Sequence, residues 1–332
     1  MNVKRKKVLV TGAAGFIGSH LVEYLLTQKC EVVCLVYPGE NLRWIEGLDV
    51  TLVEGNITKK EDLYTAVQGV QFIYHLAGKM GGWSSPELLY NINSKGTKLL
   101  LEVCCESNVK LERFIFASSM AVMGNTGKTE IYDESRPPNP KSDYGKSKLL
   151  AEKYLSGFNL SIPYTILRLP LVYGPRGKRG LNAFFRLANK RISILVEKTY
   201  TNVGYVEDIV KGMFLAAHSP AAVGKTYFLG ENQIYNSEEI VRLIARAVGK
   251  RTIKISLPYP LLYSLAAVIE GTASLTKSHP IVRKKYLSEY LKSHWRFSIE
   301  KAAIDFNFTA NFPLAEGLKL TSDWYKEHGF KL

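Results

Sequence analysis

One stretch decides the fold of this chain: Lys7-Val-Leu-Val-Thr-Gly12-Ala-Ala-Gly15-Phe-Ile-Gly18. Its first five residues have the composition of a short buried strand, and apolar residues after Gly18 recur at helical spacing as far as Leu26. A glycine turn between a strand and a helix is the context of a dinucleotide-binding loop. Glycine lets the backbone approach a pyrophosphate, and the helix N-terminus carries partial positive charge. We therefore expect a dinucleotide at this turn; a purely structural turn is the alternative.

Tyr144 and Lys148 stand four residues apart in the run Ser142-Asp-Tyr144-Gly-Lys-Ser-Lys148. On a helix, both side chains project from one face. An isolated tyrosine titrates near ~10, and a neighbouring ammonium stabilises its phenolate. The pair therefore indicates an acid–base centre, whereas a surface helix with scattered lysines is the plainer interpretation of these two residues alone.

Composition indicates a globular protein with one large or two closely joined domains. The chain has 332 residues, is 46% hydrophobic, and carries a formal net charge of +14. Its basic residues are dispersed, except at Lys4–Lys7 and Arg283–Lys285, and no nucleic-acid-binding motif accompanies them. We expect no nucleic-acid partner. The excess charge suits an anionic cofactor, an acyl carrier or an anionic membrane surface, or is simply solvated.

The cysteines and the apolar runs bear on location. Cys30, Cys34, Cys104 and Cys105 lack zinc-site spacing, so we expect no metal and interpret them as reduced thiols of a cytoplasmic protein. The basic N-terminus passes straight into a strand, unlike a signal peptide. The longest apolar run, 260–269, is shorter than the ~18 to 20 residues of a membrane span.

Strands and helices alternate through the first half. The expected strands are 7–11, 31–36, 50–54, 71–76, 112–118 and 162–169, and the expected helices lie near 16–28, 60–68, 86–108 and 143–157. Several of these strands are apolar throughout, which is typical of a parallel sheet covered on both faces. The predicted fold class is α/β: a Rossmann doubly wound parallel sheet with a smaller, mainly helical C-terminal substrate domain. Ligands should bind at the carboxyl ends of the strands.

The pattern becomes less regular after Gly174-Pro175. Two segments look like returns to the sheet, at 202–208 and 225–230, and the remaining predicted helices are 237–248, 260–275, 281–292 and 314–327. We expect a dinucleotide-binding Rossmann domain at 1–174 plus about 201–230. The substrate-binding domain should comprise about 175–200 and 231–332.

The glycine loop and the Tyr144/Lys148 pair, in this order and at this distance, resemble the extended short-chain dehydrogenase/reductase family, which includes the NAD-dependent epimerase/dehydratases. Other segments agree with the family pattern over nearly the whole chain: His75–Gly78, Asn93–Thr97, Phe116–Gly124, Asp133-Glu134, Pro140–Tyr144, Leu167–Pro170, Val172–Pro175, Tyr205–Asp208 and Asp305–Tyr325. The pattern most resembles the 3β-hydroxysteroid dehydrogenase, dihydroflavonol reductase and hopanoid-associated branch, including Asn41–Val50.

This resemblance implies catalytic roles for Ser119, Tyr144 and Lys148. Tyr144 would exchange a proton with the substrate oxygen, Ser119 would hydrogen-bond that oxygen, and Lys148 would favour the phenolate and hold the nicotinamide ribose. The resemblance also implies contacts with NAD(P) from Gly12, Gly15, Phe16, Ile17, Gly18, Tyr37, Arg43, Asn56, Ile57, Leu76, Ala77, Gly78, Tyr144, Lys148, Pro170 and Val172.

The second strand bears on the choice of cofactor. NAD-dependent relatives commonly end this strand with an acid, whereas Val36 stands there in this chain. Tyr37 replaces the arginine of many NADP-dependent relatives, but Arg43 could reach a 2′-phosphate, and without the acid nothing repels one. Asn56 replaces an aspartate often found near adenine. We expect NAD(P), with a slight preference for NADP.

Particular positions discriminate between reactions. Met120 and Ala121 replace the Asp-Glu pair of the sugar dehydratases, which argues against dehydration and against the related decarboxylation. Leu171 and Thr201 replace polar residues that nucleotide-sugar epimerases usually place near the substrate diphosphate. We therefore favour interconversion of a secondary alcohol and a ketone on an apolar, steroid-, lipid- or polyketide-like substrate. A nucleotide-sugar epimerase is the alternative, and an inactive NADP-sensing regulatory protein is the third interpretation.

Substrate contacts and partners complete the expectations. Predicted substrate contacts are Lys79, Trp83, Ser118, Met120 and Leu171. We expect a homodimer formed through the helices near 86–108 and 143–157. Contact of 260–275 and the Arg283 cluster with a membrane surface is an open option, as is burial of that helix under the substrate domain.

Overall fold

The computed structural model describes residues 5–81, 84–158, 161–195, 197–275 and 293–330. Trp83 and the predicted helix 281–292 lie outside these residues. In the described part of the chain, no helix combines the length and the apolar composition needed to cross a bilayer.

A parallel sheet forms the centre of the molecule. Its strand order is β11-β6-β5-β4-β1-β2-β3, and every neighbouring pair is parallel. The strands are β1 (Lys7–Thr11), β2 (Glu31–Val36), β3 (Val50–Glu54), β4 (Phe72–His75), β5 (Arg113–Ser119), β6 (Tyr164–Leu169) and β11 (Lys225–Phe228). The order reverses between β1 and β4, which makes this the switch point of a doubly wound sheet. The predicted Rossmann class is confirmed.

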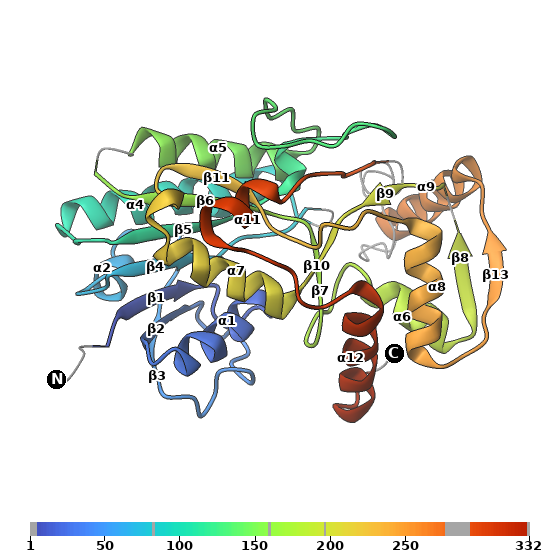
Figure 1. Cartoon of the computed structure of the whole chain (residues 1–332), viewed down its shortest axis with the longest axis horizontal. Coiled ribbons are helices and arrows are strands. Elements are labelled where there is room, and N and C mark those ends of the chain that lie inside the picture. Colours follow the sequence, from blue (N-terminus) through green and yellow to red (C-terminus); the bar gives the residue numbers. More distant parts are fainter. Residues whose placement is uncertain (1–4, 82–83, 159–160, 196, 276–292, 331–332) are drawn as a thin grey trace.

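Helices cover both faces of this sheet (Figure 1). One layer contains α1 (Phe16–Thr27), α7 (Val206–His218) and α11 (Glu300–Phe306), and the other contains α2 (Leu63–Ala66), α4 (Gly96–Glu106) and α5 (Asp143–Gly157). Successive strand residues face opposite layers: Val8 and Val10 belong to one core, and Leu9 to the other. Burial on both sides explains why these strands are apolar throughout.

The predicted helix 86–108 contains a change of helix type. It begins as α3 (Pro86–Leu89), continues as a π-helical turn over Tyr90–Lys95, and becomes α4. The wide turn buries Asn93 and Ser94. A π-helical turn inside an α-helix often marks a functional site.

A smaller unit lies beyond the carboxyl end of the sheet (Figure 1). Its helices are α6 (Asn182–Asn189), α8 (Ser237–Val248), α9 (Tyr259–Leu275) and α12 (Leu314–Glu327), and its strand pairs are β7 (Leu171–Tyr173) with β10 (Val203–Tyr205), β9 (Tyr200–Thr201) with β12 (Tyr235–Asn236), and β8 (Ile192–Leu195) with β13 (Ile253–Ser256). The predictions 237–248 and 314–327 match α8 and α12 at both ends. Asn236 caps α8, since its Oδ1 accepts from the Glu239 N–H at 2.9 Å.

The segment 297–308 lies in a different place from the one expected. It was assigned to the substrate-binding domain, but the side chains of Phe297, Ala302 and Phe308 pack in the same core as α1 and α7. The C-terminal part of the chain thus returns to the Rossmann sheet through α11 before it ends in the smaller unit as α12.

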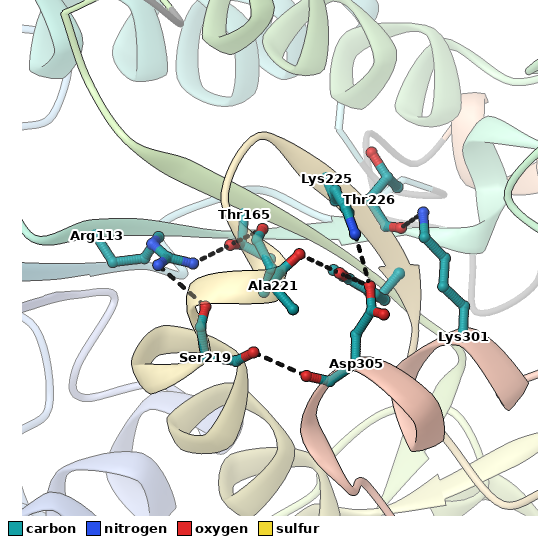
Figure 2. A network of polar contacts seen from close by, with 10 residues as sticks. Arg113, Thr165, Ser219, Ala221, Lys225, Thr226, Lys301 and Asp305 are labelled. Atoms are coloured by element: carbon teal, nitrogen blue, oxygen red, sulfur yellow. Dashed lines mark hydrogen bonds and ion pairs between the residues drawn. The ribbon is translucent and has the colours of Figure 1, made fainter.

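A polar network fastens α11 to the amino-terminal end of the sheet (Figure 2). Arg113, the first residue of β5, donates to Thr165 Oγ1 at 3.0 Å and to the Ser219 carbonyl at 3.1 Å. The Ser219 hydroxyl donates to the Asp305 carbonyl at 2.8 Å, and Lys225 forms an ion pair with the Asp305 carboxylate at 3.0 Å. These contacts lie at the end of β5 opposite Ser119, so their role is structural.

Candidate active site

The glycine turn fits closely against the end of β4. Gly12 has φ +71°, and a Cβ built on it would lie 2.8 Å from the backbone nitrogen of Ala77. The same contact is held by hydrogen bonds, since Leu76 N donates to the Thr11 carbonyl and Ala77 N donates to Thr11 Oγ1, each at 3.1 Å. The predicted cofactor residues Gly12, Leu76 and Ala77 are therefore brought together at the switch point.

The first turn of α1 suits an anion. Gly15 is its N-cap and provides no side-chain cap, so the first N–H groups of the helix remain for a ligand. The turn reads Phe16-Ile-Gly18-Ser and contains no acidic residue, so the positive end of the helix dipole is not neutralised from within the turn. A Cβ at Gly18 would collide with the Gly12 carbonyl oxygen. This cradle fits the pyrophosphate of a dinucleotide.

Ser119 and Tyr144 come from elements that touch at the same end of the sheet. Ser119 ends β5, and its Oγ accepts from Ala121 N at 3.2 Å at the start of a short 3₁₀ turn. Ser142 caps α5, accepting from Gly145 N at 3.1 Å, which places Tyr144 in the first turn. A Cβ at Gly145 would collide with the Ala121 carbonyl oxygen, so the first turn of α5 rests directly on the backbone after Ser119.

Lys148 lies one turn further along α5 and reaches between the ends of β4 and β5. Its Nζ donates to the Ala117 carbonyl at 2.8 Å and lies 4.7 Å from the centre of the Phe116 ring. A Cβ built on Gly78 would be 3.3 Å from this Nζ. Burial lowers the pKa of Lys148 to about 8, against an opposing effect of the Glu152 carboxylate. The ammonium thus lies beside the cofactor loop, where a ribose hydroxyl could accept from it.

Asn93 is a residue of this site that the predicted residues omitted. Its Oδ1 accepts from Lys79 N at 2.7 Å, and its Nδ2 donates to the Lys79 carbonyl at 2.9 Å and to Ser147 Oγ at 3.0 Å. Asn93 therefore fixes the loop after β4 to α5, next to Lys148. The signal was present in the sequence, in the segment Asn93–Thr97 that carried part of the family resemblance.

A buried histidine connects the glycine turn to α4. His75 Nδ1 lies 2.6 Å from Thr11 Oγ1, and its Nε2 lies 2.9 Å from Thr97 Oγ1. The Thr97 hydroxyl donates to the Asn93 carbonyl at 2.7 Å, so it must accept from Nε2–H, and Nδ1 must accept from Thr11. Burial lowers the pKa of His75 to about 3, and the charge of Lys148 adds to the effect. His75 is therefore uncharged, and it links Thr11 to Thr97 through hydrogen bonds.

The end of β2 differs from the expectation in one respect. Val36 leaves the strand end without an acid in the sequence, yet the chain turns back so that Glu40 Oε2 accepts from Tyr37 N at 3.3 Å. A carboxylate thus lies near the strand end after all. The expectation that nothing at the end of β2 repels a 2′-phosphate is therefore wrong, because the Glu40 carboxylate lies there.

Arg43 is held by aromatic rings. Its guanidinium lies 4.1 Å from the centre of the Trp44 ring and 5.6 Å from that of Phe330. On the adenine side, Asn56 Oδ1 accepts from Thr58 N at 3.0 Å and from Thr58 Oγ1 at 2.9 Å. With Oδ1 engaged by Thr58, Nδ2 is the group of Asn56 that could donate to an adenine, as the resemblance implied. Ile57 is buried and packs on Gly96, below this surface.

The remaining predicted residues differ in how far they are buried. Lys79 is exposed, Met120 is buried beside Ser119, and Pro170, Leu171 and Val172 are half-buried around β7. Phe16 and Ile17 are half-buried in the first turn of α1.

Ser118 does not join the substrate contacts that were expected of it. It is 3% exposed, and its hydroxyl donates to Glu152 Oε1 at 2.5 Å. Glu152 in turn forms a two-point ion pair with Arg168, at 2.8 and 3.1 Å. Side chains alternate along β5, so Ser118 and Ser119 point to opposite faces of the strand. Ser118 therefore belongs to a buried ionic cluster behind the site.

A Rossmann sheet with a glycine turn at its switch point, a second unit over its carboxyl edge, and Ser119, Tyr144 and Lys148 at that edge are the features of an extended short-chain dehydrogenase/reductase. Residues 8–236 match the model of the NAD dependent epimerase/dehydratase family, and the chain belongs to that family. The enzymes of this family and fold are NAD-dependent dehydrogenases, reductases and epimerases.

Relatives of both reaction types resemble the chain. A Bacillus subtilis (strain 168) protein, the uncharacterized UDP-glucose epimerase YtcB, is 34% identical over 74% of this chain and 83% of its own. The 2-alkyl-3-oxoalkanoate reductase of Shewanella oneidensis is 24% identical over 95% of this chain and 85% of its own. The solved UDP-glucose 4-epimerase of Thermus thermophilus, in complex with NAD, superimposes with a TM-score of 0.78 at 27% identity, covering 96% of this chain and 99% of its own.

Proposed function

We propose that this protein is an NAD(P)-dependent oxidoreductase that interconverts a secondary alcohol and a ketone on an apolar substrate. The observation that supports the proposal is that the elements carrying Ser119 and Tyr144 touch at Ala121 and Gly145, with Lys148 one turn away. A hydroxyl, a phenol and an ammonium at the carboxyl edge of the sheet suit proton transfer at a carbonyl.

Each side chain has a distinct part in this proposal. A bound nicotinamide supplies or accepts the hydride. Tyr144 exchanges the proton of the substrate oxygen, and Ser119 hydrogen-bonds the same oxygen and orients it. Lys148 binds the ribose and favours the phenolate form of Tyr144. Its lowered pKa means that a cofactor phosphate or phenolate nearby is needed to keep it fully charged above about pH 8.

The residues around Ser119 favour redox chemistry over elimination. Met120 and Ala121 are both buried and have no acidic group to protonate a leaving hydroxyl. Leu171 and Thr201 offer no positive charge to a substrate diphosphate. A nucleotide sugar would have to bury its two phosphates against these uncharged residues, which costs desolvation free energy. An apolar substrate avoids this cost.

A 3-oxo acid is the substrate class that we favour. The reductases of Shewanella oneidensis and Stenotrophomonas maltophilia, named for 2-alkyl-3-oxoalkanoates, are 24% and 25% identical over 95% and 94% of this chain. Such a substrate pairs apolar tails with one carboxylate. Lys79 suits the carboxylate because its backbone is fixed by Asn93 at both N and O, while its side chain is exposed.

A nucleotide-sugar epimerase is the second candidate, and the 34% identity with YtcB favours it. The same three side chains would serve it, with hydride leaving and returning on opposite faces of the sugar. A third candidate is a protein that binds NADP and regulates without turnover, which would not need Ser119, Tyr144 and Lys148 together.

We also propose a homodimer through α4 and α5, and NADP in preference to NAD, with Arg43 as the 2′-phosphate partner.

One substrate panel separates these candidates. The purified protein is incubated with NADPH or NADH and a 2-alkyl-3-oxo acid, a ketosteroid or a UDP-hexose. Net oxidation of the reduced cofactor by a ketone, absent in Tyr144→Phe, supports the reductase. Isomerised sugar without net cofactor consumption supports the epimerase instead. Cofactor binding without any turnover across the panel contradicts both enzymatic proposals.

A further inference from the structure

The small sheet of β8 and β13 has one face made of isoleucines. Its strands are parallel, with Ile253 opposite Ile192 and Ile255 opposite Ile194. Because side chains alternate along a strand, these residues share one face, which we term the isoleucine face. Ile253 is 72% exposed and Ile255 is 40% exposed, although large apolar side chains are usually buried.

The opposite face of the same sheet is turned toward α8. Ser193 and Lys254 line a cavity of about 270 Å³ against that helix, and Lys254 lies 3.8 Å from the Glu238 carboxylate. The isoleucine face therefore points away from the body of the protein. Figure 1 shows β8 and β13 beyond α8, at the end of the molecule farthest from the N-terminus. This position leaves the face accessible to a large partner.

Basic residues gather at one end of the isoleucine face. Lys190 and Arg191 immediately precede β8, and Lys250 and Arg251 precede β13 with only Thr252 between, so the parallel register brings both pairs to the same end of the sheet. The cavity behind the sheet is also cationic. Its basic lining residues are Arg242, Arg246, Lys250, Arg251 and Lys254, with Glu238 as the acidic one.

We propose that this surface docks on an anionic lipid bilayer. Isoleucines would enter the acyl boundary, while the basic residues at the end of the sheet would meet lipid phosphates, which is the combination that peripheral membrane binding requires. A second copy of this chain suits the face less well, because a chain of net charge +14 would bring these basic residues together. The inference does not depend on the proposed reaction. It also differs from the option considered from the sequence, which relied on 260–275 and Arg283.

Vesicle sedimentation of the full-length protein tests the proposal. One set of vesicles contains phosphatidylcholine alone, and the other contains phosphatidylcholine mixed with phosphatidylglycerol. We expect binding to the anionic vesicles only, weakening as salt is raised. The double variant Ile253→Ser, Ile255→Ser should bind at least about tenfold more weakly, because its apolar insertion is lost. Ile304→Ser is the matched control, since Ile304 is also 72% exposed but lies on α11; it should bind like the wild type.

A charge variant and a sizing measurement make the outcome decisive. Arg191→Glu with Arg251→Glu, both exposed at the end of the sheet, should also weaken binding to anionic vesicles. Wild-type protein that stays in the supernatant with anionic vesicles would overturn the proposal, as would an isoleucine variant that sediments like the wild type. Light scattering adds one further outcome: if the isoleucine variant turns a dimer into a monomer, the face is a self-association surface and the membrane assignment is wrong.

Discussion

The ammonium of Lys148 lies 2.8 Å from the carbonyl oxygen of Ala117, two residues before Ser119. This one hydrogen bond joins the helix that carries Tyr144 to the strand that ends in Ser119. It also holds a positive charge in a buried place, because the Lys148 side chain is 4% exposed. A charge in such a place reduces the stability of the protein unless a bound ligand compensates it.

Replacing Lys148 by methionine should therefore stabilise the protein and abolish turnover. The pKa of about 8 lies below the ordinary 10.5, which corresponds to about 3 kcal/mol of unfavourable burial at pH 7. Loss of the donor to Ala117 offsets about 1 kcal/mol, so a gain of roughly 2 kcal/mol should remain. The folded lysine loses its proton first, so the gain should shrink between pH 8 and 10.5.

Urea unfolding of Lys148→Met at pH 7 and pH 10 measures this difference. Lys146→Met is the control, since Lys146 is exposed on the same helix and should change little. If the Lys148 variant unfolds more easily than the wild type at pH 7, the buried charge is not a stability cost.

Arg43 and Glu40 should set the choice between NADP and NAD. Arg43→Ala should weaken NADP binding about tenfold, the loss of one charged contact of about 1.4 kcal/mol, and leave NAD binding unchanged. Glu40→Gln should strengthen NADP binding a few-fold, because its carboxylate lies next to Tyr37 N at the end of β2. Fluorescence titration of each variant with both cofactors checks this. Equal losses for both cofactors in Arg43→Ala would remove Arg43 as the phosphate partner.

The sequence predicted the strands of the central sheet and the approximate bounds of several helices, because those features depend on local patterns. For example, α5 begins and ends at the predicted residues, since Ser142 is a recognisable cap and the apolar spacing continues to Leu155. The sequence did not predict α6, α7 or α11, and the expected return to the sheet at 202–208 was wrong, since β10 pairs with β7 outside the central sheet.

The π-helical turn at Tyr90–Lys95 was not predicted, because nothing in its mostly polar sequence distinguishes it from an ordinary α-helical turn. The turn contains Asn93, whose side chain makes hydrogen bonds with Lys79 and Ser147, residues distant in the sequence.

Two other differences also come from contacts between distant residues. Ser118 and Ser119 are neighbours in the sequence, and only the partner Glu152 shows which one faces the core. The segment around Phe297 and Phe308 is visibly apolar, but an apolar pattern does not say which core it joins. The Ser119, Tyr144 and Lys148 set could be proposed from the sequence because its spacing resembles a known family. The hydrogen bonds that position it could not.

Arg113 should be important for stability and unimportant for catalysis. It is 5% exposed, and its guanidinium donates to the neutral acceptors Thr165 Oγ1 and the Ser219 carbonyl (Figure 2). Arg113→Met should lower the free energy of unfolding by about 2 to 3 kcal/mol, because Arg113, unlike Lys148, serves several buried acceptors, and leaving Thr165 Oγ1 and the Ala216 and Ser219 carbonyls without their donor outweighs the relief of its buried charge. Arg136→Met, which removes an exposed ion pair with Glu130, should cost less than about 1 kcal/mol. Below its melting temperature, an Arg113 variant with greatly reduced kcat would contradict a structural role.

Two of the buried histidines, His75 and His20, should make the protein acid-sensitive. Burial lowers the pKa of His75 to about 3 and that of His20 to about 4, below the ordinary 6.5. Between pH 6.5 and 5 the unfolded chain binds these protons while the folded chain does not, so stability falls as the pH falls. At pH 5 each histidine should account for a loss of about 2 kcal/mol relative to pH 7. His75→Gln should remove about half of this combined loss, whereas His328→Gln, at an exposed position, should remove none. Urea unfolding at both pH values gives the comparison, and a His75 variant that loses as much stability as the wild type would show that His75 is not kept neutral by the fold.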